Sequence, residues 1–96
     1  MRTVFVIQDV NGKNLLPAGE HGKLRVILSG REDPETAMSK LQDAMEGFTS
    51  IDFLLLIGSP INIALAAHIA LRKLGSVNFL VWDRTNYRYN IERIVT

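Results

Sequence analysis

The sequence predicts an α/β fold: a layered sandwich with a mixed sheet in the order β-loop-β-α-β-α-β-β, closed by a C-terminal hairpin. Three observations lead to this prediction. Short apolar runs rich in β-branched residues recur along the chain, two stretches show helical spacing of apolar residues, and each of these lies between two apolar runs. The length of 96 residues fits a single α/β domain over residues 1–96.

The first half of the sheet is predicted from two apolar runs, residues 3–7 and 24–28. The connection between them, residues 8–23, is long for a small domain, and such loops are more often functional than short ones. We expect it to be a surface loop packed by Leu15 and Leu16. The order of these first two strands within the sheet is left open by so long a connection.

The first helix begins with a recognisable capping sequence. Asp33 can accept a hydrogen bond from the free N–H groups, Pro34 suits the first turn, and Glu35 favours the positive end of the helix dipole. The helix is expected to end near Gly47. One apolar stripe is predicted to be buried: Ala37, Met38, Leu41, Ala44, Met45 and Phe48.

The second half of the chain follows the same pattern. Residues 53–57 form an uninterrupted apolar run, which is typical of a strand covered on both faces. The second helix is predicted to start at the cap Ser59 and to stop at Gly75. Residues 77–82 and 87–95 then form a hairpin. A bulge near Glu92 is expected, because the alternation of the last strand slips there.

Composition excludes several functional classes. The chain has 11 basic and 10 acidic residues, too balanced to indicate a nucleic-acid-binding protein, and it has no cysteine. With two histidines and no cysteine we expect no metal site and no cofactor. No apolar run is long enough to span a membrane, so we expect no membrane association and a cytoplasmic location.

The second helix is unusually apolar. Nine of the eleven residues from 61 to 71 are apolar, whereas a helix on one face of a sheet should keep a polar stripe. Because a chain of this size hides only about 60–65% of its unfolded surface, we expect a second copy of the chain to cover the helix. The alternative is that the first helix and the loop 8–23 cover it within one chain. The predicted homo-oligomer interface consists of Ile61, Ala64, Leu65, His68 and Leu71.

A candidate ligand site lies where the third strand meets the second helix. A helix N-terminus that follows a parallel strand can hold an anion on its backbone N–H groups. Ser59 is explained more simply as a plain helix cap, and Pro60 removes one donor. The predicted ligand residues are Gly58, Ser59 and Asn62, together with Asp9 and Asn11 from the long loop.

No catalytic constellation is recognisable. Ser59 lacks the glycine pattern of a nucleophile elbow, and His68 lies about 13 Å of helix rise away from it. The aromatic and arginine residues of the hairpin could stack on single-stranded nucleic acid, but residues 77–96 carry a net charge of only +1. Cross-strand pairing explains the same residues more simply. We therefore predict no catalytic residues and no nucleic-acid partner.

Several segments along the chain form a recognisable combination. They are the opening strand at residues 4–7, the Gly22-Lys23-Leu24 entry to the second strand and Asp52 before an apolar strand, followed by the small-residue helix, residues 75–80 and the closing segment 89–94. In this combination the chain resembles small uncharacterised α/β proteins encoded by tailed bacteriophages. The resemblance implies a phage product that acts in the bacterial cytoplasm, and it carries no catalytic residues.

Two functional hypotheses follow. The first is a non-enzymatic, phage-encoded accessory protein that self-associates and binds a macromolecular partner, a host or phage protein. The second is a module that binds a small molecule or a nucleotide-like anion at the turn between the third strand and the second helix.

Overall fold

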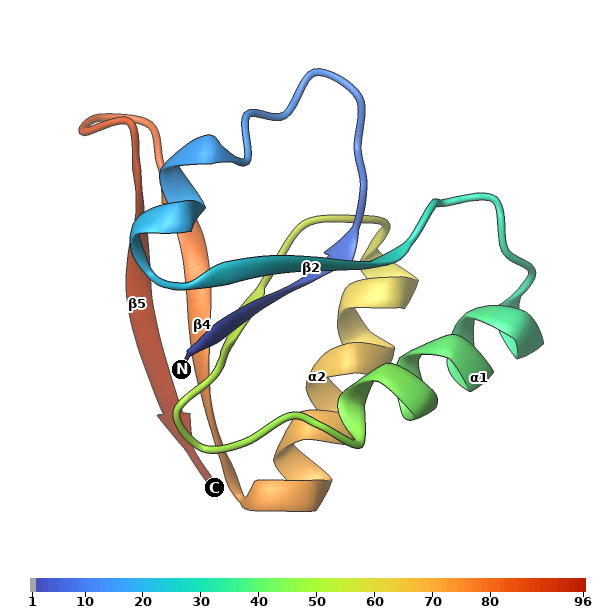
Figure 1. The fold of residues 1–96 in the computed structure, drawn as a ribbon. Helices are drawn as coiled ribbons and strands as arrows, with labels where there is room; N and C mark the ends of the chain where they lie inside the picture. The colour runs from blue at the N-terminus through green and yellow to red at the C-terminus, as the bar shows by residue number, and fades with distance from the viewer. Residues whose placement is uncertain (1) are drawn as a thin grey trace.

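The computed structural model describes residues 2–96 and confirms the predicted α/β fold, with a mixed sheet and a C-terminal hairpin (Figure 1). The strand order is β2-β1-β3-β4-β5; the first four strands are mutually parallel and β5 is antiparallel to β4. The elements are β1 (Thr3–Gln8), the 3₁₀ helix η1 (Leu16–Glu20), β2 (Lys23–Leu28), α1 (Pro34–Met45), β3 (Phe53–Leu55), α2 (Pro60–Leu74), β4 (Ser76–Asp83) and β5 (Arg88–Val95).

The two faces of the sheet are covered by different structures. Helices α1 and α2 lie together on one face, while the segment between β1 and β2, with η1 in it, lies on the other (Figure 1). Each cover builds its own apolar cluster. The helix-side cluster is formed by Phe5, Ile7, Leu28, Ala37, Leu41, Met45, Phe48, Leu54, Ala66, Ala70 and Val77. The opposite cluster is formed by Val4, Val6, Ala18, Phe53, Leu55, Ile57, Leu80 and Tyr89.

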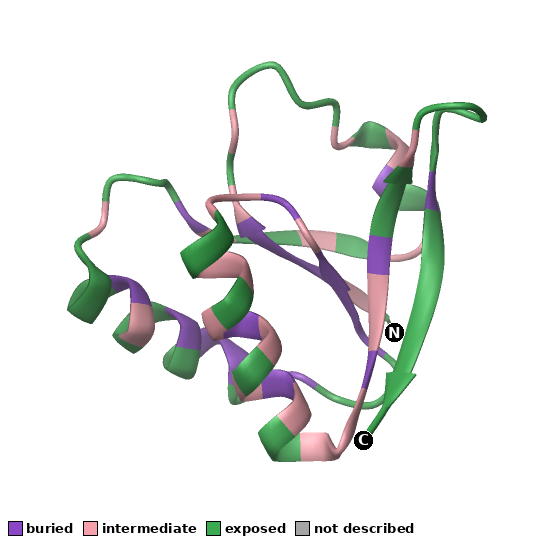
Figure 2. Ribbon diagram, turned by 180° about the vertical axis from the view of Figure 1, so that it is seen from behind, coloured by how far each residue is buried: buried purple, intermediate pink, exposed green. Residues whose placement is uncertain are grey.

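Strands β1 and β3 are central and buried on both faces (Figure 2). This agrees with their unbroken apolar runs, since a strand that is covered twice needs no polar alternation. Strand β3 is shorter than predicted. The ladder continues past it for one bond, from the Leu56 N–H to the Leu80 carbonyl, and the Ile57 N–H then turns back to the Leu55 carbonyl.

Both helices begin at their predicted caps and α2 ends at the predicted glycine, whereas α1 ends at Met45, two residues before Gly47. The Asp33 carboxylate accepts a hydrogen bond from the Thr36 N–H at 2.7 Å, and the Ser59 hydroxyl accepts one from the Asn62 N–H at 3.2 Å. At the end of α2, Gly75 adopts a left-handed conformation and donates its N–H to the Leu71 carbonyl.

The long connection differs from the prediction in its packing. Leu15 is half-buried against the sheet, but Leu16 is 82% exposed, because η1 turns it toward solvent and buries the smaller Ala18 instead. Of the two covers considered for α2 within one chain, the loop is wrong because it lies on the opposite face of the sheet, whereas α1 does pack against α2, with the Lys73 ammonium donating to the Met45 and Glu46 carbonyls. Only Ala66 and Ala70 of α2 are fully buried.

The predicted bulge near Glu92 does not form. The β4–β5 register runs without interruption from Ser76–Val95 to Asp83–Arg88. The slipped alternation instead leaves Ile94 and Val95 exposed. This is tolerated because β5 is an edge strand whose end has no cover on either face, so burial places little constraint on its pattern.

Asp52 is the one charged residue that is buried in residues 2–96, with 5% exposure. Its carboxylate accepts hydrogen bonds from the Thr3 N–H at 3.0 Å, the Thr49 N–H at 2.8 Å and the Thr49 hydroxyl at 2.9 Å. The residue therefore ties the start of β1 to the loop that leads into β3.

Replacing Asp52 with alanine is expected to lower the free energy of unfolding by about 2–4 kcal/mol, because it leaves part-buried N–H donors without their acceptor. Urea denaturation measures the change. Asp43→Ala, on the exposed side of α1, is the control and should cost no more than about 0.5 kcal/mol. Equal stability of the two variants would contradict the role given to Asp52.

Candidate ligand-binding site

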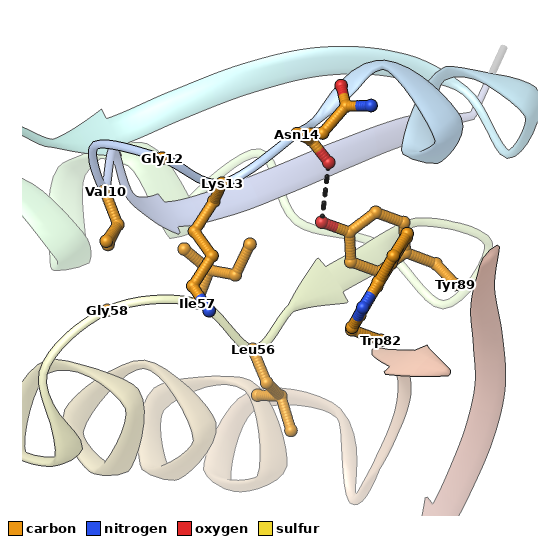
Figure 3. A pocket seen from close by; sticks show the side chains of 9 residues that line it. All are labelled: Val10, Gly12, Lys13, Asn14, Leu56, Ile57, Gly58, Trp82 and Tyr89. Atoms are coloured by element: carbon orange, nitrogen blue, oxygen red, sulfur yellow. Dashed lines mark hydrogen bonds between the residues drawn. The ribbon is translucent and has the colours of Figure 1, made fainter. Parts of the chain in front are cut away.

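A cavity of about 440 Å³ opens at the carboxyl ends of β1, β3 and β4 (Figure 3). Its walls come from the loop after β1, the turn after β3, the last part of β4 and the start of β5. Its volume lies in the range of small-molecule sites, about 300–1,000 Å³. The lining residues are Val10, Gly12, Lys13, Asn14, Leu56, Ile57, Gly58, Trp82 and Tyr89.

The topology explains why a cavity forms at this place. From β1 the chain goes to β2 on one side, while β3 and β4 are added on the other side. The connections after β1 and β3 therefore leave the sheet in different directions and on different faces. A crevice at such a switch point, at the carboxyl ends of the strands, is where open α/β sheets bind ligands.

Aromatic side chains form one wall of the cavity. The Trp82 ring packs at 5.0 Å from the Tyr89 ring and at 6.4 Å from the Tyr87 ring, both at steep angles. Tyr89 is 2% exposed, and its hydroxyl donates a hydrogen bond to the Asn14 carbonyl at 3.1 Å (Figure 3). Burial raises the pKa of Tyr89, so the phenol stays neutral and remains a donor.

The position of Tyr89 is also secured from the side of η1. The His21 Nε2 donates a hydrogen bond to the Tyr89 carbonyl at 3.0 Å and lies 3.2 Å from the Glu20 carboxylate. Two hydrogen bonds thereby attach the loop after β1, which forms one wall, to the β4–β5 hairpin, which forms the other. One is made by His21, at the end of the loop, and one by Asn14, nearer the cavity.

Lys13 is the one lining residue with a formal charge at neutral pH. Its side chain extends from the loop across the cavity toward the turn at residues 56–58 (Figure 3). Leu56 points away, toward the helix-side cluster, so only its backbone faces the cavity. The cavity thus combines apolar and aromatic walls with a single positive charge.

The N-terminus of α2 is closed by Gln8 at the end of β1. The Gln8 Oε1 accepts hydrogen bonds from the Ser59 N–H and from the Asn62 side-chain amide, both at 2.9 Å. The Asn62 N–H is taken by the Ser59 hydroxyl and the Ile63 N–H by the Ser59 carbonyl. The backbone N–H groups of Ser59 and Asn62 and the Asn62 side-chain amide, which were predicted to hold an anion, therefore donate to the chain itself.

Two glycines make room for Gln8. A Cβ atom on Gly58 would lie 2.8 Å from Gln8 Oε1, and one on Gly30 would lie 2.6 Å from Gln8 Nε2. Both glycines have positive φ angles, 138° and 94°.

The Gly30 loop is held by Glu32, which accepts hydrogen bonds from Ser29, Gly30 and Lys40. The backbone hydrogen bond from Ser29 is the largest cause that lowers the pKa of Glu32.

The structure brings together only part of the predicted ligand site. Gly58 lines the cavity, whereas Ser59 and Asn62 lie behind it, engaged with Gln8. Asp9 and Asn11 are exposed in the loop and do not line the cavity. The neighbours Lys13 and Asn14, and the hairpin residues Trp82 and Tyr89, were not predicted as ligand residues. The signal that could have placed Trp82 there is its position at the carboxyl end of a parallel strand.

The predicted interface residues lie together on one face of α2. Ile61, Ala64 and His68 are exposed, and Leu65 and Leu71 are half-buried. Ile61, Ala64 and His68 lie on the exposed side of α2, whereas Leu65 and Leu71 at its edges pack against the helix-side cluster.

A family model described as Phage Pam3 gp32-like protein matches residues 2–94. The chain belongs to the Phage Pam3 gp32-like protein family. This confirms the resemblance to phage-encoded proteins that the sequence showed. No curated protein and no solved structure matches the chain.

Across residues 2–96 no helix combines the length and apolar character needed to cross a bilayer, and no three His, Asp or Glu residues gather as a metal site would require.

Replacing Gly58 with alanine is expected to lower the free energy of unfolding by about 1–3 kcal/mol, because it strains the backbone and displaces Gln8. Thermal or urea unfolding measures the effect. Gly19→Ala is the control, since its Cβ would meet no atom within 4 Å. A Gly58→Ala variant as stable as the Gly19→Ala variant would show that Gln8 does not need this space.

Proposed function

We propose that this phage protein is a non-enzymatic accessory protein that binds a small molecule in the cavity at the carboxyl ends of β1, β3 and β4. The observation that carries the proposal is the convergence of four separate segments on one cavity at the switch point of the sheet. The long loop, the turn at Gly58 and the aromatic hairpin were separate features in the sequence, and each contributes a wall.

The chemistry of the lining supports binding rather than catalysis. Trp82 is 37% exposed and offers an aromatic surface, while Lys13 supplies an amine that can orient a ligand. The side-chain amide of Asn14 points away from the cavity and accepts a hydrogen bond from the Leu16 N–H, so the polar side-chain groups of the lining are one amine and one neutral phenol (Figure 3). These groups recognise a ligand without forming a paired acid and base or an activated nucleophile.

The protein is expected to retain a small molecule when it is dialysed against a metabolite extract of the bacterial host. Mass spectrometry of the compounds released on denaturation identifies what is retained. Trp82→Ala should lose this compound because the aromatic wall is removed.

Ile91→Ala is the matched control for that experiment. Ile91 is 51% exposed on the same hairpin and does not line the cavity, so this variant should retain the compound. Retention by Trp82→Ala as strong as by the unmodified protein, or no retention by any folded variant, would reject the proposal.

Self-association through α2 is a second proposed property, carried by a different observation. The stripe Ile61, Ala64 and His68 is exposed, and the loop 8–23 lies on the other face of the sheet. The occupant we propose is the same face of a second copy, because the small Ala64 at its centre allows two helices to approach closely. A face shared by two copies would leave the cavity open, since the cavity is built from loops and strand ends.

The mass in solution tests this interface. Light scattering should give twice the mass of the 10.8 kDa chain for the unmodified protein. Ala64→Arg should give a monomer, because it places a charge in the apolar contact. Ser39→Arg, on the exposed side of α1, should remain dimeric. A monomeric unmodified protein at all concentrations would rule the interface out.

A further inference from the structure

The cavity contains two kinds of recognition group on opposite sides, and together they specify a ligand class. Trp82 and Tyr89 lie on the hairpin side, and Lys13 extends from the loop side (Figure 3). We infer that the cavity takes a flat aromatic ring carrying one acidic group, with the ring against Trp82 and the acidic group at Lys13. This inference rests on the proposed function and adds the class of ligand.

The aromatic half is supported by how firmly Trp82 is held. Its ring makes edge contacts with Tyr87 and Tyr89, at interplanar angles of 67° and 62°. Two steeply inclined neighbours fix the indole in one orientation while more than a third of the residue stays exposed. A preorganised indole of this kind offers a flat ring a surface on which to stack without first ordering a flexible side chain.

The acidic half is supported by the distribution of charge. Lys13 is the single cationic residue in the lining, and no carboxylate lines the cavity with it. Within residues 2–96 the salt bridges involve His21, Lys40 and Arg88, and none involves Lys13. An exposed ammonium group that has no salt-bridge partner and no carboxylate beside it in the lining favours an anion over a neutral or cationic ligand.

The state of Gln8 decides where the acidic group goes. A helix N-terminus at a switch point would normally attract it, but the Ser59 N–H and the Asn62 amide already donate to Gln8. Binding at α2 would require the Gln8 amide to leave a position wedged between Gly30 and Gly58. Lys13 is therefore the available site for the negative charge. An anion that lacks a ring would contact Lys13 alone and is expected to bind weakly.

The same chemistry occurs in mononucleotides and in aryl carboxylates, so the test uses both. The probes are adenosine monophosphate and naphthalene-1-carboxylate, with adenosine as the ring alone and ribose 5-phosphate as the acid alone. Isothermal titration calorimetry measures all four. Quenching of Trp82, the only tryptophan in the chain, reports contact with the cavity for the nucleotide series.

We expect at least one of the two ring-and-acid probes to bind and to bind more tightly than adenosine or ribose 5-phosphate. Lys13→Gln should weaken that probe about fivefold and leave adenosine unchanged, since it removes one partly exposed ion pair. Lys23→Gln, an exposed lysine on β2 away from the cavity, is the matched control and should change nothing. Which of the two probes binds identifies the source of the acid.

Three outcomes would overturn the inference. Ribose 5-phosphate binding as tightly as the nucleotide would show that the ring is not recognised. Adenosine binding as tightly as adenosine monophosphate, with no effect of Lys13→Gln on the nucleotide, would show that the acidic group is not recognised. If no probe binds although a metabolite is still retained from the extract, the inferred ligand class is wrong and the proposed function stands. If no probe binds and no metabolite is retained, the ligand class and the proposed function are both wrong.

Discussion

The side chain of Gln8 joins three parts of the chain that are far apart in the sequence. It leaves the end of β1, bonds to the first turn of α2 and fits between two glycines, Gly30 and Gly58, whose conformations only glycine adopts readily. This one amide therefore sets the position of α2 relative to the strand ends. It also replaces, within the protein, the anion that a helix N-terminus at this place would otherwise attract. The closed end of α2, next to the cavity, is a consequence of this contact.

The division of the sheet into two differently covered faces separates the two proposed activities. The helices take up one face and present the apolar side of α2 to the outside, while η1 and its loop take up the other face and build the cavity with the hairpin. A 3₁₀ segment covers less of a sheet than a full helix does. The uncovered space at the strand ends is what makes a cavity possible in so short a chain, and the aromatic residues of β4 and β5 fill part of it.

Sequence patterns predicted the elements well and the site only in part. Caps such as Asp33 and Ser59 act locally, so their consequences can be inferred from a few neighbouring residues. The bulge near Glu92 was predicted wrongly because burial does not shape the sequence pattern of β5. Leu16 was expected to pack under the loop but is exposed, because the loop forms η1. The cavity depends on pairings across the chain that periodicity does not contain: Tyr89 reaches Asn14 over 75 positions, and Gln8 reaches Asn62 over 54.

The place of β1 in the sheet also determines the order in which the chain can assemble. The first strand to be synthesised lies between β2 and β3, and the bond from Thr3 to Asp52 spans 49 positions. Pairing of β1 with β2 alone would leave its second edge open until more than half of the chain is available. Such long-range parallel pairing carries a high loop-closure entropy and slows folding. During synthesis, β1 therefore keeps one apolar edge exposed until α1 and then β3 have been made, because β3 is the strand that pairs with that edge.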